Sequence, residues 1–215
     1  MPKIEAFQKY ADEYDNWFVT NFYAFLSELK AIKKLIPNVD GVIEIGIGSG
    51  VFAKPLGIHE GIEPSEAMRN KAKKNGLKVF DAVAEKLPYD NLSLNGVVMI
   101  TSICFVDDVY QSFREAYRVL KKDGFLILAF VDKDSTVGKE YLKHKNKSMF
   151  YKDASFFSSK ELYEILQQCG FEVSETCQTI FGKVVDIKEI QTVREGFGDG
   201  SFVVIKAKKN YGRHI

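Results

Sequence analysis

Short apolar runs alternate along this chain with stretches in which apolar residues recur at helical spacing. Runs of this length are typical of buried strands, and recurrence every three or four positions is typical of amphipathic helices. The predicted strands are residues 41–46, 58–63, 77–81, 95–101, 124–131, 171–180 and 201–208. The predicted helices lie near 16–35, 51–56, 64–75, 107–121 and 158–169. The alternation predicts a doubly wound α/β fold, a mostly parallel sheet covered on both faces.

The end of the chain breaks this alternation. No helical pattern separates the last two predicted strands, only the glycine-containing segment 181–200. We therefore expect these two strands to pair antiparallel, which gives seven strands with the last one reversed. In open sheets of this kind, ligands bind at the carboxyl ends of the strands, near the reversal of strand order.

A glycine loop follows the first predicted strand. Residues 42–50 run from an apolar strand into Gly46, Gly48 and Gly50, where a helix should begin. Glycine allows a tight turn and close approach of a ligand to the backbone. The dinucleotide fingerprint requires glycine where this chain has Val51, and the Gly-Lys-Ser/Thr of a P-loop is absent. Neither common phosphate cradle fits.

Two carboxylates accompany this loop. Glu44 directly precedes the glycines, and Glu63 ends the second predicted strand. A carboxylate roughly 20 residues after the loop stands where a ribose diol would be bound. A carboxylate beside the glycines repels phosphate and attracts ammonium. The pair predicts a ligand with a ribose and a positive charge.

At this point the chain resembles the class I methyltransferases that use S-adenosylmethionine, whose first motif is an acidic residue followed by Gly-x-Gly-x-Gly. Residues 63–68 look like the acidic second motif, and 84–89 look like the Ala-Glu-x-Leu-Pro-Phe segment. Residues 113–121 with Gly124 are similar to the helix and turn before the fifth strand. The resemblance extends from residue 42 to about 130, is closest to small-molecule enzymes of methyltransferase type 11, and implies one Rossmann-like domain over 1–215.

The resemblance also implies a set of cofactor-binding residues. Glu44 would bind the methionine ammonium, Glu63 the ribose hydroxyls, and the backbone of Ala84 the adenine ring, which would lie near Pro64 and Leu87. The full expected set is Glu44, Gly46, Ile47, Gly48, Gly50, Glu63, Pro64, Val83, Ala84, Glu85 and Thr101. The implied cofactor is S-adenosylmethionine.

Three positions depart from the family pattern. Val83 stands where many relatives have the Asp that reads the adenine amino group. Losing that hydrogen bond costs roughly 0.5–1.5 kcal/mol, about tenfold in affinity. Asn95 replaces an Asp before the fourth strand, and Cys104 lies where relatives often carry a histidine. The usual candidate base is therefore missing, which leaves Tyr14 and Thr101 as candidate catalytic residues.

Two segments are expected to cover the site. Residues 7–18 resemble the Tyr-Ala-x-x-Tyr-Asp-x-Trp lead-in of small-molecule methyltransferases, so residues 1–35 are expected to form a helical lid. Aromatic side chains there, Tyr14 and Trp17 among them, could cover a sulfonium by cation–π contact. Residues 132–157 stand where this fold usually grows a substrate cover.

Composition narrows the choice of partners. The 215 residues are 46% hydrophobic and 27% charged, with 30 basic and 29 acidic side chains and a formal charge of +1. This balance argues against nucleic acid or membrane as partner. The cysteines and histidines lack metal-site spacing, and no apolar run reaches roughly 20 residues. We expect a cytoplasmic protein that binds no metal.

The leading hypothesis is a methyltransferase acting on a small molecule. The lysine-rich segment 139–152 is expected to be a solvated helix face, and the Asn-Pro-Pro-Tyr motif of amino-methylating nucleic-acid enzymes is absent. A methyltransferase acting on RNA or protein, a degenerate or regulatory S-adenosylmethionine-binding protein, and a nucleotide-dependent oxidoreductase remain alternatives.

Overall fold

The computed structural model describes residues 3–210 and is built around one sheet of eight strands. Their spatial order is β3-β2-β1-β4-β5-β8-β6-β7. The strands are β1 (Val42–Ile45), β2 (Glu60–Ile62), β3 (Lys78–Phe80), β4 (Leu94–Ile100), β5 (Leu120–Val131), β6 (Phe171–Thr179), β7 (Arg194–Glu195) and β8 (Phe202–Lys209). Order reverses between β1 and β4, which places a ligand crevice at their carboxyl ends.

The pairing confirms the Rossmann-like sheet with a reversed last strand. Strands β1 to β5 pair parallel, and β8 lies antiparallel between β5 and β6. The expected count of seven is wrong, because β7 adds an eighth strand at the edge of β6, through Cys177 opposite Glu195 and Gln178 opposite Arg194. A strand of two exposed residues is too short to leave an alternating pattern in the sequence.

Each of the five predicted helical segments contains helix, although their boundaries differ. The helices are α1 (Glu5–Lys9), α2 (Ala11–Thr20), α3 (Phe22–Leu35), α4 (Ala53–Leu56), α5 (Glu66–Lys74), α6 (Val109–Val119), α7 (Thr136–His144) and α8 (Ser159–Gln168). The predicted helix 16–35 is interrupted at Asn21, whose side-chain amide donates to the carbonyl of Trp17. Helix α7 overlaps the segment 139–152 that was expected to present a solvated helix face, although its bounds were not predicted. It begins where Ser135 accepts from the backbone N–H of Gly138.

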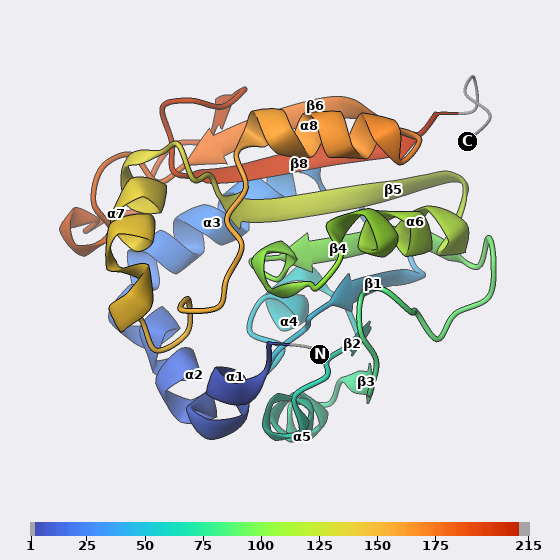
Figure 1. Ribbon diagram of the computed structural model, residues 1–215, viewed down its shortest axis with the longest axis horizontal. Coiled ribbons are helices and arrows are strands. Elements are labelled where there is room, and N and C mark those ends of the chain that lie inside the picture. Colours follow the sequence, from blue (N-terminus) through green and yellow to red (C-terminus); the bar gives the residue numbers. More distant parts are fainter. Residues whose placement is uncertain (1–2, 211–215) are drawn as a thin grey trace.

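Successive side chains of the central strands point to opposite faces of the sheet, so the core is divided into two layers. In β5, Ile127 and Ala129 face a layer that includes α3 and α4, while Leu126 and Leu128 face α6 and α8. Successive strand residues point to opposite faces, so a strand buried on both sides is apolar throughout. Figure 1 shows α6 and α8 in front of the sheet and α3 behind it.

The carboxyl ends of the parallel strands carry a further helical layer. In Figure 1, α1, α2 and α7 lie on the side toward which β4 points, across the end of the sheet. The segments 5–20 and 136–144 are far apart in sequence, yet both cover this end. Within residues 3–210, no helix is long and apolar enough to cross a membrane.

Candidate functional site

A cavity of about 210 Å³ opens at the carboxyl ends of the strands, beneath the helices that cover them. Ten of the residues singled out in the sequence line it: Tyr14, Trp17, Gly46, Gly48, Glu63, Pro64, Val83, Ala84, Glu85 and Thr101. They come from the ends of β1, β2, β4 and the loop after β3, together with α2. The fold therefore collects residues from five separate segments around one space.

Three other predicted residues do not line this cavity. Glu44 and Ile47 are only 2% and 3% exposed, and the Ile47 side chain belongs to the core cluster that includes Phe52. Gly50 has a structural role, since a Cβ there would lie 2.2 Å from Cδ1 of Leu77. Ile47 and Gly50 therefore support the loop from behind its ligand-facing surface.

The loop after β1 depends on glycine at its ligand-facing position. Gly48 has a φ of 58°, in the left-handed region that favours glycine. The nearest atom to a Cβ at this position would be Cε1 of Tyr14, 3.8 Å away, so the space above it is open. A ligand can therefore approach the Gly48 backbone closely.

Glu63 ties this loop to the end of β2. Its Oε2 accepts a hydrogen bond of 3.0 Å from the Gly48 N–H, and its Oε1 accepts one of 2.8 Å from the Ser65 N–H. Burial raises the pKa of Glu63, and these two N–H donors oppose the rise. A carboxylate has about four lone-pair positions, so two remain for a ligand with two hydroxyl groups.

Glu44 carries a buried oxygen that lacks a protein partner. Its Oε2 accepts no hydrogen bond from any residue in the described part of the chain. Burial, and then the charge of Glu63, raises the pKa of Glu44 well above its ordinary value. Buried polar atoms are almost always satisfied, so an orphan at the end of a central strand indicates that a ligand completes it.

Thr101 and Tyr14 both line the cavity, and the Thr101 side chain is hydrogen-bonded to the Tyr14 phenol. Thr101 follows β4 with a φ of 51°, a strained value for a β-branched residue. Such strain concentrates at functional sites. Burial raises the pKa of the Tyr14 phenol, while the Thr101 hydroxyl opposes that rise. Tyr14 is therefore a neutral hydrogen-bonding group at neutral pH rather than a base.

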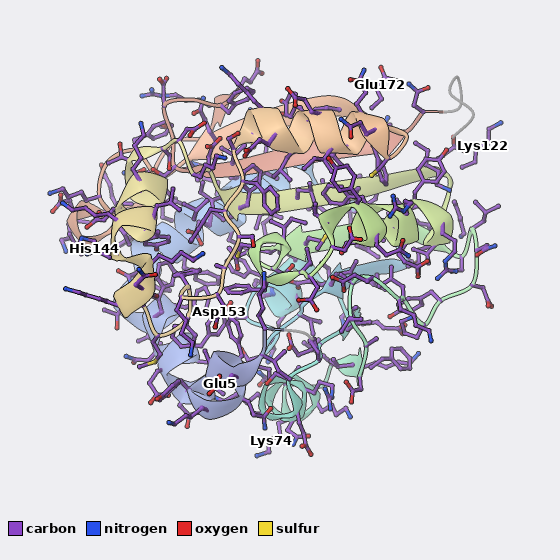
Figure 2. The ribbon with its side chains drawn as sticks, viewed as in Figure 1. Glu5, Lys74, Lys122, His144, Asp153 and Glu172 are labelled. Atoms are coloured by element: carbon purple, nitrogen blue, oxygen red, sulfur yellow. The ribbon has the colours of Figure 1, made fainter. Side chains whose placement is uncertain are left out.

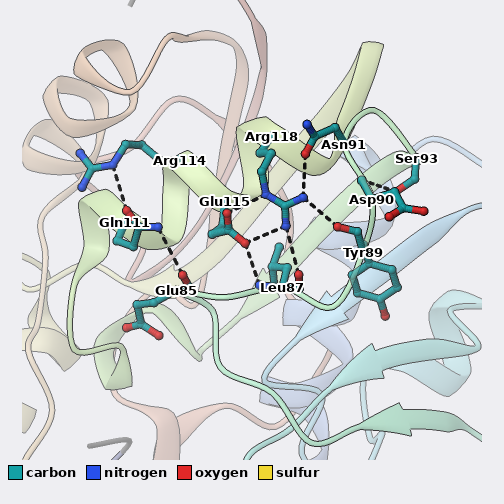
Figure 3. Close-up of polar contacts among 10 residues, drawn as sticks. All are labelled: Glu85, Leu87, Tyr89, Asp90, Asn91, Ser93, Gln111, Arg114, Glu115 and Arg118. Carbon is teal, nitrogen blue, oxygen red and sulfur yellow. Dashed lines mark hydrogen bonds and ion pairs between the residues drawn. The ribbon is translucent and has the colours of Figure 1, made fainter.

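The loop after β3 is fastened to α6, partly through Glu85. Its carboxylate accepts from the backbone N–H groups of Asp107 at 2.7 Å and Asp108 at 3.0 Å, and its carbonyl accepts from the side-chain amide of Gln111. Figure 3 shows Gln111 reaching the Glu85 main chain. The Glu85 carboxylate thus has protein partners at the start of α6.

Arg118 holds the rest of this loop in place. Its guanidinium donates to the carbonyls of Leu87 and Tyr89 and to both carboxylate oxygens of Glu115 (Figure 3). Glu115 in turn accepts from the Leu87 N–H at 2.8 Å. The Leu87 side chain is buried in the core, so it supports the loop without lining the cavity. Bidentate pairs of this kind fix a backbone firmly.

The amino-terminal helices are bonded to both motif loops. Asp15 accepts from the Ser49 hydroxyl at 2.5 Å, next to the glycines, and also pairs with Lys71 at 2.7 Å. The side-chain oxygen of Gln8 accepts from the Ser65 hydroxyl and the Ala67 N–H, both at 3.1 Å. Helices α1 and α2 are therefore held against the loops that follow β1 and β2.

Aromatic contacts join these helices to the segment 132–157. The Phe7 ring lies 4.9 Å from Phe105 and 5.5 Å from both Tyr14 and Phe150. The Tyr151 ring stacks on Phe105 at 5.9 Å, centroid to centroid. The cavity is closed over by rings from both segments.

Glu28 is a cavity residue that the sequence reasoning missed. It lies on α3, is 6% exposed and lines the cavity. Burial raises its pKa to about 8. A signal existed, because Glu28 stands on the apolar stripe of its helix, between Ala24 and Ile32, where core residues are expected. A search for site residues that considers only the ends of strands does not find a residue on a helix.

The remaining candidates lie away from the cavity. The Asn95 amide donates to the carbonyl of Asp40 at 2.7 Å, at the opposite end of β4. His59 and His144 are exposed, and Figure 2 shows His144 at the outer edge of the molecule. His214 lies outside the described residues. Over residues 3–210, no three His, Cys, Asp or Glu side chains are grouped to hold a metal ion.

Comparison with known proteins relates this arrangement to one family. The family model described as a methyltransferase domain matches residues 43–128. An uncharacterised protein of Methanocaldococcus jannaschii is 41% identical over 206 residues, covering 96% of this chain and 100% of the relative. The similarity therefore extends over the amino-terminal helices and the last strands as well as the matched domain.

Two solved structures show how far the likeness reaches. A SAM-dependent methyltransferase of Thermotoga maritima, described as a possible histamine N-methyltransferase, is 45% identical. It has a TM-score of 0.94, over 97% of this chain and 100% of that one. A methyltransferase in complex with the Haloferax volcanii Trm112 methyltransferase activator is 19% identical with a TM-score of 0.72, over 95% and 98% of the chains. The second likeness concerns the fold alone.

Proposed function

Because the chain belongs to the class I S-adenosylmethionine-dependent methyltransferases, we propose that it binds S-adenosylmethionine and methylates a small-molecule acceptor. The observation that carries the cofactor assignment is the pair of buried carboxylates at the ends of β1 and β2. The orphan oxygen of Glu44 suits an ammonium group, and the free lone pairs of Glu63 suit a ribose diol.

The rest of the cofactor fits the same wall of the cavity. The Gly48 backbone is open to a ligand, and Pro64, Val83 and Ala84 line the cavity with apolar groups that suit an adenine ring. Glu85 also lines the cavity, and both of its backbone hydrogen bonds fall on Oε1, so its Oε2 remains available to accept from the adenine amino group. Val83 makes only apolar contact and offers no hydrogen bond to the adenine. We therefore expect a modestly lower cofactor affinity than in relatives with Asp at this position.

When bound, S-adenosylmethionine supplies a methyl group on a positively charged sulfur, which an acceptor atom attacks in line. The protein contributes by holding the methyl donor and the acceptor in the correct relative position. Holding two reactants in near-attack geometry supplies on the order of 7–11 kcal/mol. Thr101 and Tyr14 line the cavity together, where they can orient the reacting groups, and the neutral phenol of Tyr14 leaves proton removal to another residue.

Enclosure supports a small acceptor. Residues 5–35 form a helical cover, residues 132–157 face it, and Phe7, Phe105 and Tyr151 join the two. We propose that these segments serve as lid and substrate cover of a single domain. The Thermotoga relative is described as a possible enzyme for a small amine, which agrees with a small acceptor here. Four of the five lysines between 139 and 152 are exposed, as expected of a solvated surface.

A transfer experiment tests this proposal. The protein is incubated with methyl-labelled S-adenosylmethionine and, separately, with a metabolite extract, total RNA and total protein. We expect label in the metabolite fraction, and less of it with a Glu63→Ala variant at a cofactor concentration below the dissociation constant of that variant. Label in RNA or protein would contradict the small-molecule acceptor. Saturable cofactor binding without label in any fraction would favour a regulatory binding protein.

A further inference from the structure

Glu28 is a buried carboxyl group that faces the cavity without a protein partner. It is 6% exposed, and no side chain or backbone group within residues 3–210 makes a hydrogen bond or ion pair with its carboxyl group. Burying a carboxyl group without a hydrogen-bond or ion-pair partner destabilises the fold. Glu63, at the other end of the cavity, instead accepts two backbone hydrogen bonds. The fold thus keeps Glu28 available at a cost in stability.

The order of strands places Glu28 far from the proposed cofactor end. Helix α3 packs against β6 and β8, whereas Glu63 ends β2. The sheet order from β2 to β8 spans four strand spacings, or roughly 19 Å at about 4.8 Å each. Gly46 and Thr101, at the ends of β1 and β4, lie between them. Glu28 therefore occupies the half of the cavity that remains for the acceptor.

The side chains around Glu28 are aromatic and apolar. The Tyr141 ring of α7 stacks on Tyr151 at 4.9 Å between centroids, and burial, with a smaller effect of the Glu28 charge, raises the pKa of both phenols. Val184 and Phe202 complete this end of the cavity. Lys3, the one lysine among the residues lining the described cavity, bonds instead to the Val106 carbonyl and the Ser155 hydroxyl. Aromatic faces beside a lone carboxylate attract organic cations.

From these observations we infer that the acceptor is a small arylalkyl amine whose ammonium group pairs with Glu28, and that Glu28 removes the proton that blocks its nitrogen. This inference rests on the proposed function, since it assigns the acceptor half of the same cavity. An anionic acceptor would be repelled by Glu28. A neutral acceptor would give the buried Glu28 carboxylate no opposite charge to pair with.

The chemical step balances with this one residue. The ammonium passes a proton to the Glu28 carboxylate, which frees the nitrogen lone pair. The nitrogen bonds to the methyl carbon as the carbon–sulfur bond breaks, and that bond's electron pair stays on sulfur. The positive charge moves to the methylated nitrogen, and Glu28 releases its proton to water when the product leaves.

Proton affinities suit this exchange. Burial raises the pKa of Glu28 to about 8, closer to that of an alkylamine than an ordinary carboxyl group. A base works best when its pKa lies near that of the group it deprotonates and near the working pH. The titratable groups that face Glu28 are the phenols of Tyr141 and Tyr151, both kept neutral by raised pKa values. Because these phenols stay protonated, they cannot accept the proton of the ammonium group, and Glu28 is the group that does.

Binding of a defined probe tests the inference. Phenethylamine is titrated into the protein saturated with S-adenosylhomocysteine, alongside 2-phenylethanol, its neutral analogue. We expect saturable phenethylamine binding that Glu28→Gln weakens at least tenfold, and weaker 2-phenylethanol binding that this variant leaves unchanged. The control is Glu140→Gln, an exposed carboxylate on α7, which should change neither ligand by more than twofold. S-adenosylhomocysteine affinity should be equal in all three proteins.

A pH profile gives a second readout. With phenethylamine as acceptor, kcat/KM of the wild type should rise as pH increases through about 8, where Glu28 ionises, and Glu28→Gln should lose this rise. Absence of phenethylamine binding, equal binding by Glu28→Gln, or tighter binding of 2-phenylethanol would overturn the inference. Failure to bind S-adenosylhomocysteine would instead contradict the proposed function, and titration of the ligand-free protein with phenethylamine would still decide the role of Glu28.

Discussion

Glu63 accepts a hydrogen bond of 3.0 Å from the backbone N–H of Gly48, so the carboxylate that ends β2 holds the glycine loop that follows β1. The two residues are fifteen positions apart in the sequence and come from neighbouring parallel strands. The same carboxylate can therefore fix the loop and bind a ligand that lies across it.

Glu63→Ala should weaken binding of S-adenosylhomocysteine at least tenfold, which corresponds to about 1.4 kcal/mol. The substitution removes the proposed ribose acceptor and also releases the Gly48 N–H. Calorimetric titration measures the effect, with Glu66→Ala as control, because Glu66 is exposed on the following helix. An unchanged dissociation constant in Glu63→Ala would refute the ribose role.

Binding of S-adenosylmethionine should release protons. Burial and the charge of Glu63 raise the pKa of Glu44, and an ammonium beside it would favour the ionised form. The complex then holds fewer protons than the free protein, so affinity should increase with pH below the raised pKa. Titration in two buffers of different ionisation enthalpy measures the release, and Glu44→Gln should reduce it. Identical proton balance in wild type and variant would exclude Glu44 as the linked group.

Two glycines with positive φ separate backbone strain from packing. Gly57 has a φ of 73°, and a Cβ at this position would have no atom within 4 Å, whereas a Cβ on Gly50, with a φ of 86°, would meet Leu77 at 2.2 Å. Gly57→Ala should lower the free energy of unfolding by about 1–2 kcal/mol through strain alone. Gly50→Ala should lose about 1–3 kcal/mol more through overpacking. Chemical denaturation measures both, and equal losses would mean that Leu77 moves aside freely.

Glu28 should make stability depend on pH. Its pKa rises from an ordinary 4.5 to about 8 on folding, so the native state holds the proton more tightly. The favourable contribution is complete below pH 4.5 and is lost as pH rises through 8. Glu28→Gln should therefore be increasingly more stable than wild type across this window, by on the order of 3–5 kcal/mol at its upper end. Denaturation midpoints measured at several pH values test this, with Glu140→Gln expected to track the wild type.

The sequence predicted the sheet well because its signals are local. Buried parallel strands such as residues 124–131 are apolar throughout, and Gly46 and Gly48 mark the turn after the first of them. The β7 strand and the bounds of helix α7 were missed for the opposite reason. Residues 194–195 and 136–144 carry little apolar periodicity, and long-range pairing or a Ser135 cap decides their structure.

The site was predictable where it follows strand ends and less so elsewhere. Glu63 and Thr101 terminate strands, so their convergence follows from the parallel sheet. Glu28 reaches the cavity only because α3 packs across β6 and β8, a tertiary arrangement that the sequence pattern does not specify. Glu85 lines the cavity, whereas its two hydrogen bonds to backbone N–H groups before α6 depend on a loop geometry that the sequence pattern does not specify.

Calorimetric titration of the protein with S-adenosylmethionine, S-adenosylhomocysteine and NAD tests the central claim most directly. The geometry of Glu44, Gly48 and Glu63 predicts saturable binding of both adenosyl ligands and none of NAD, whose pyrophosphate the Glu44 carboxylate would repel. Absence of saturable binding by either adenosyl ligand, or tighter binding of NAD, would contradict the account.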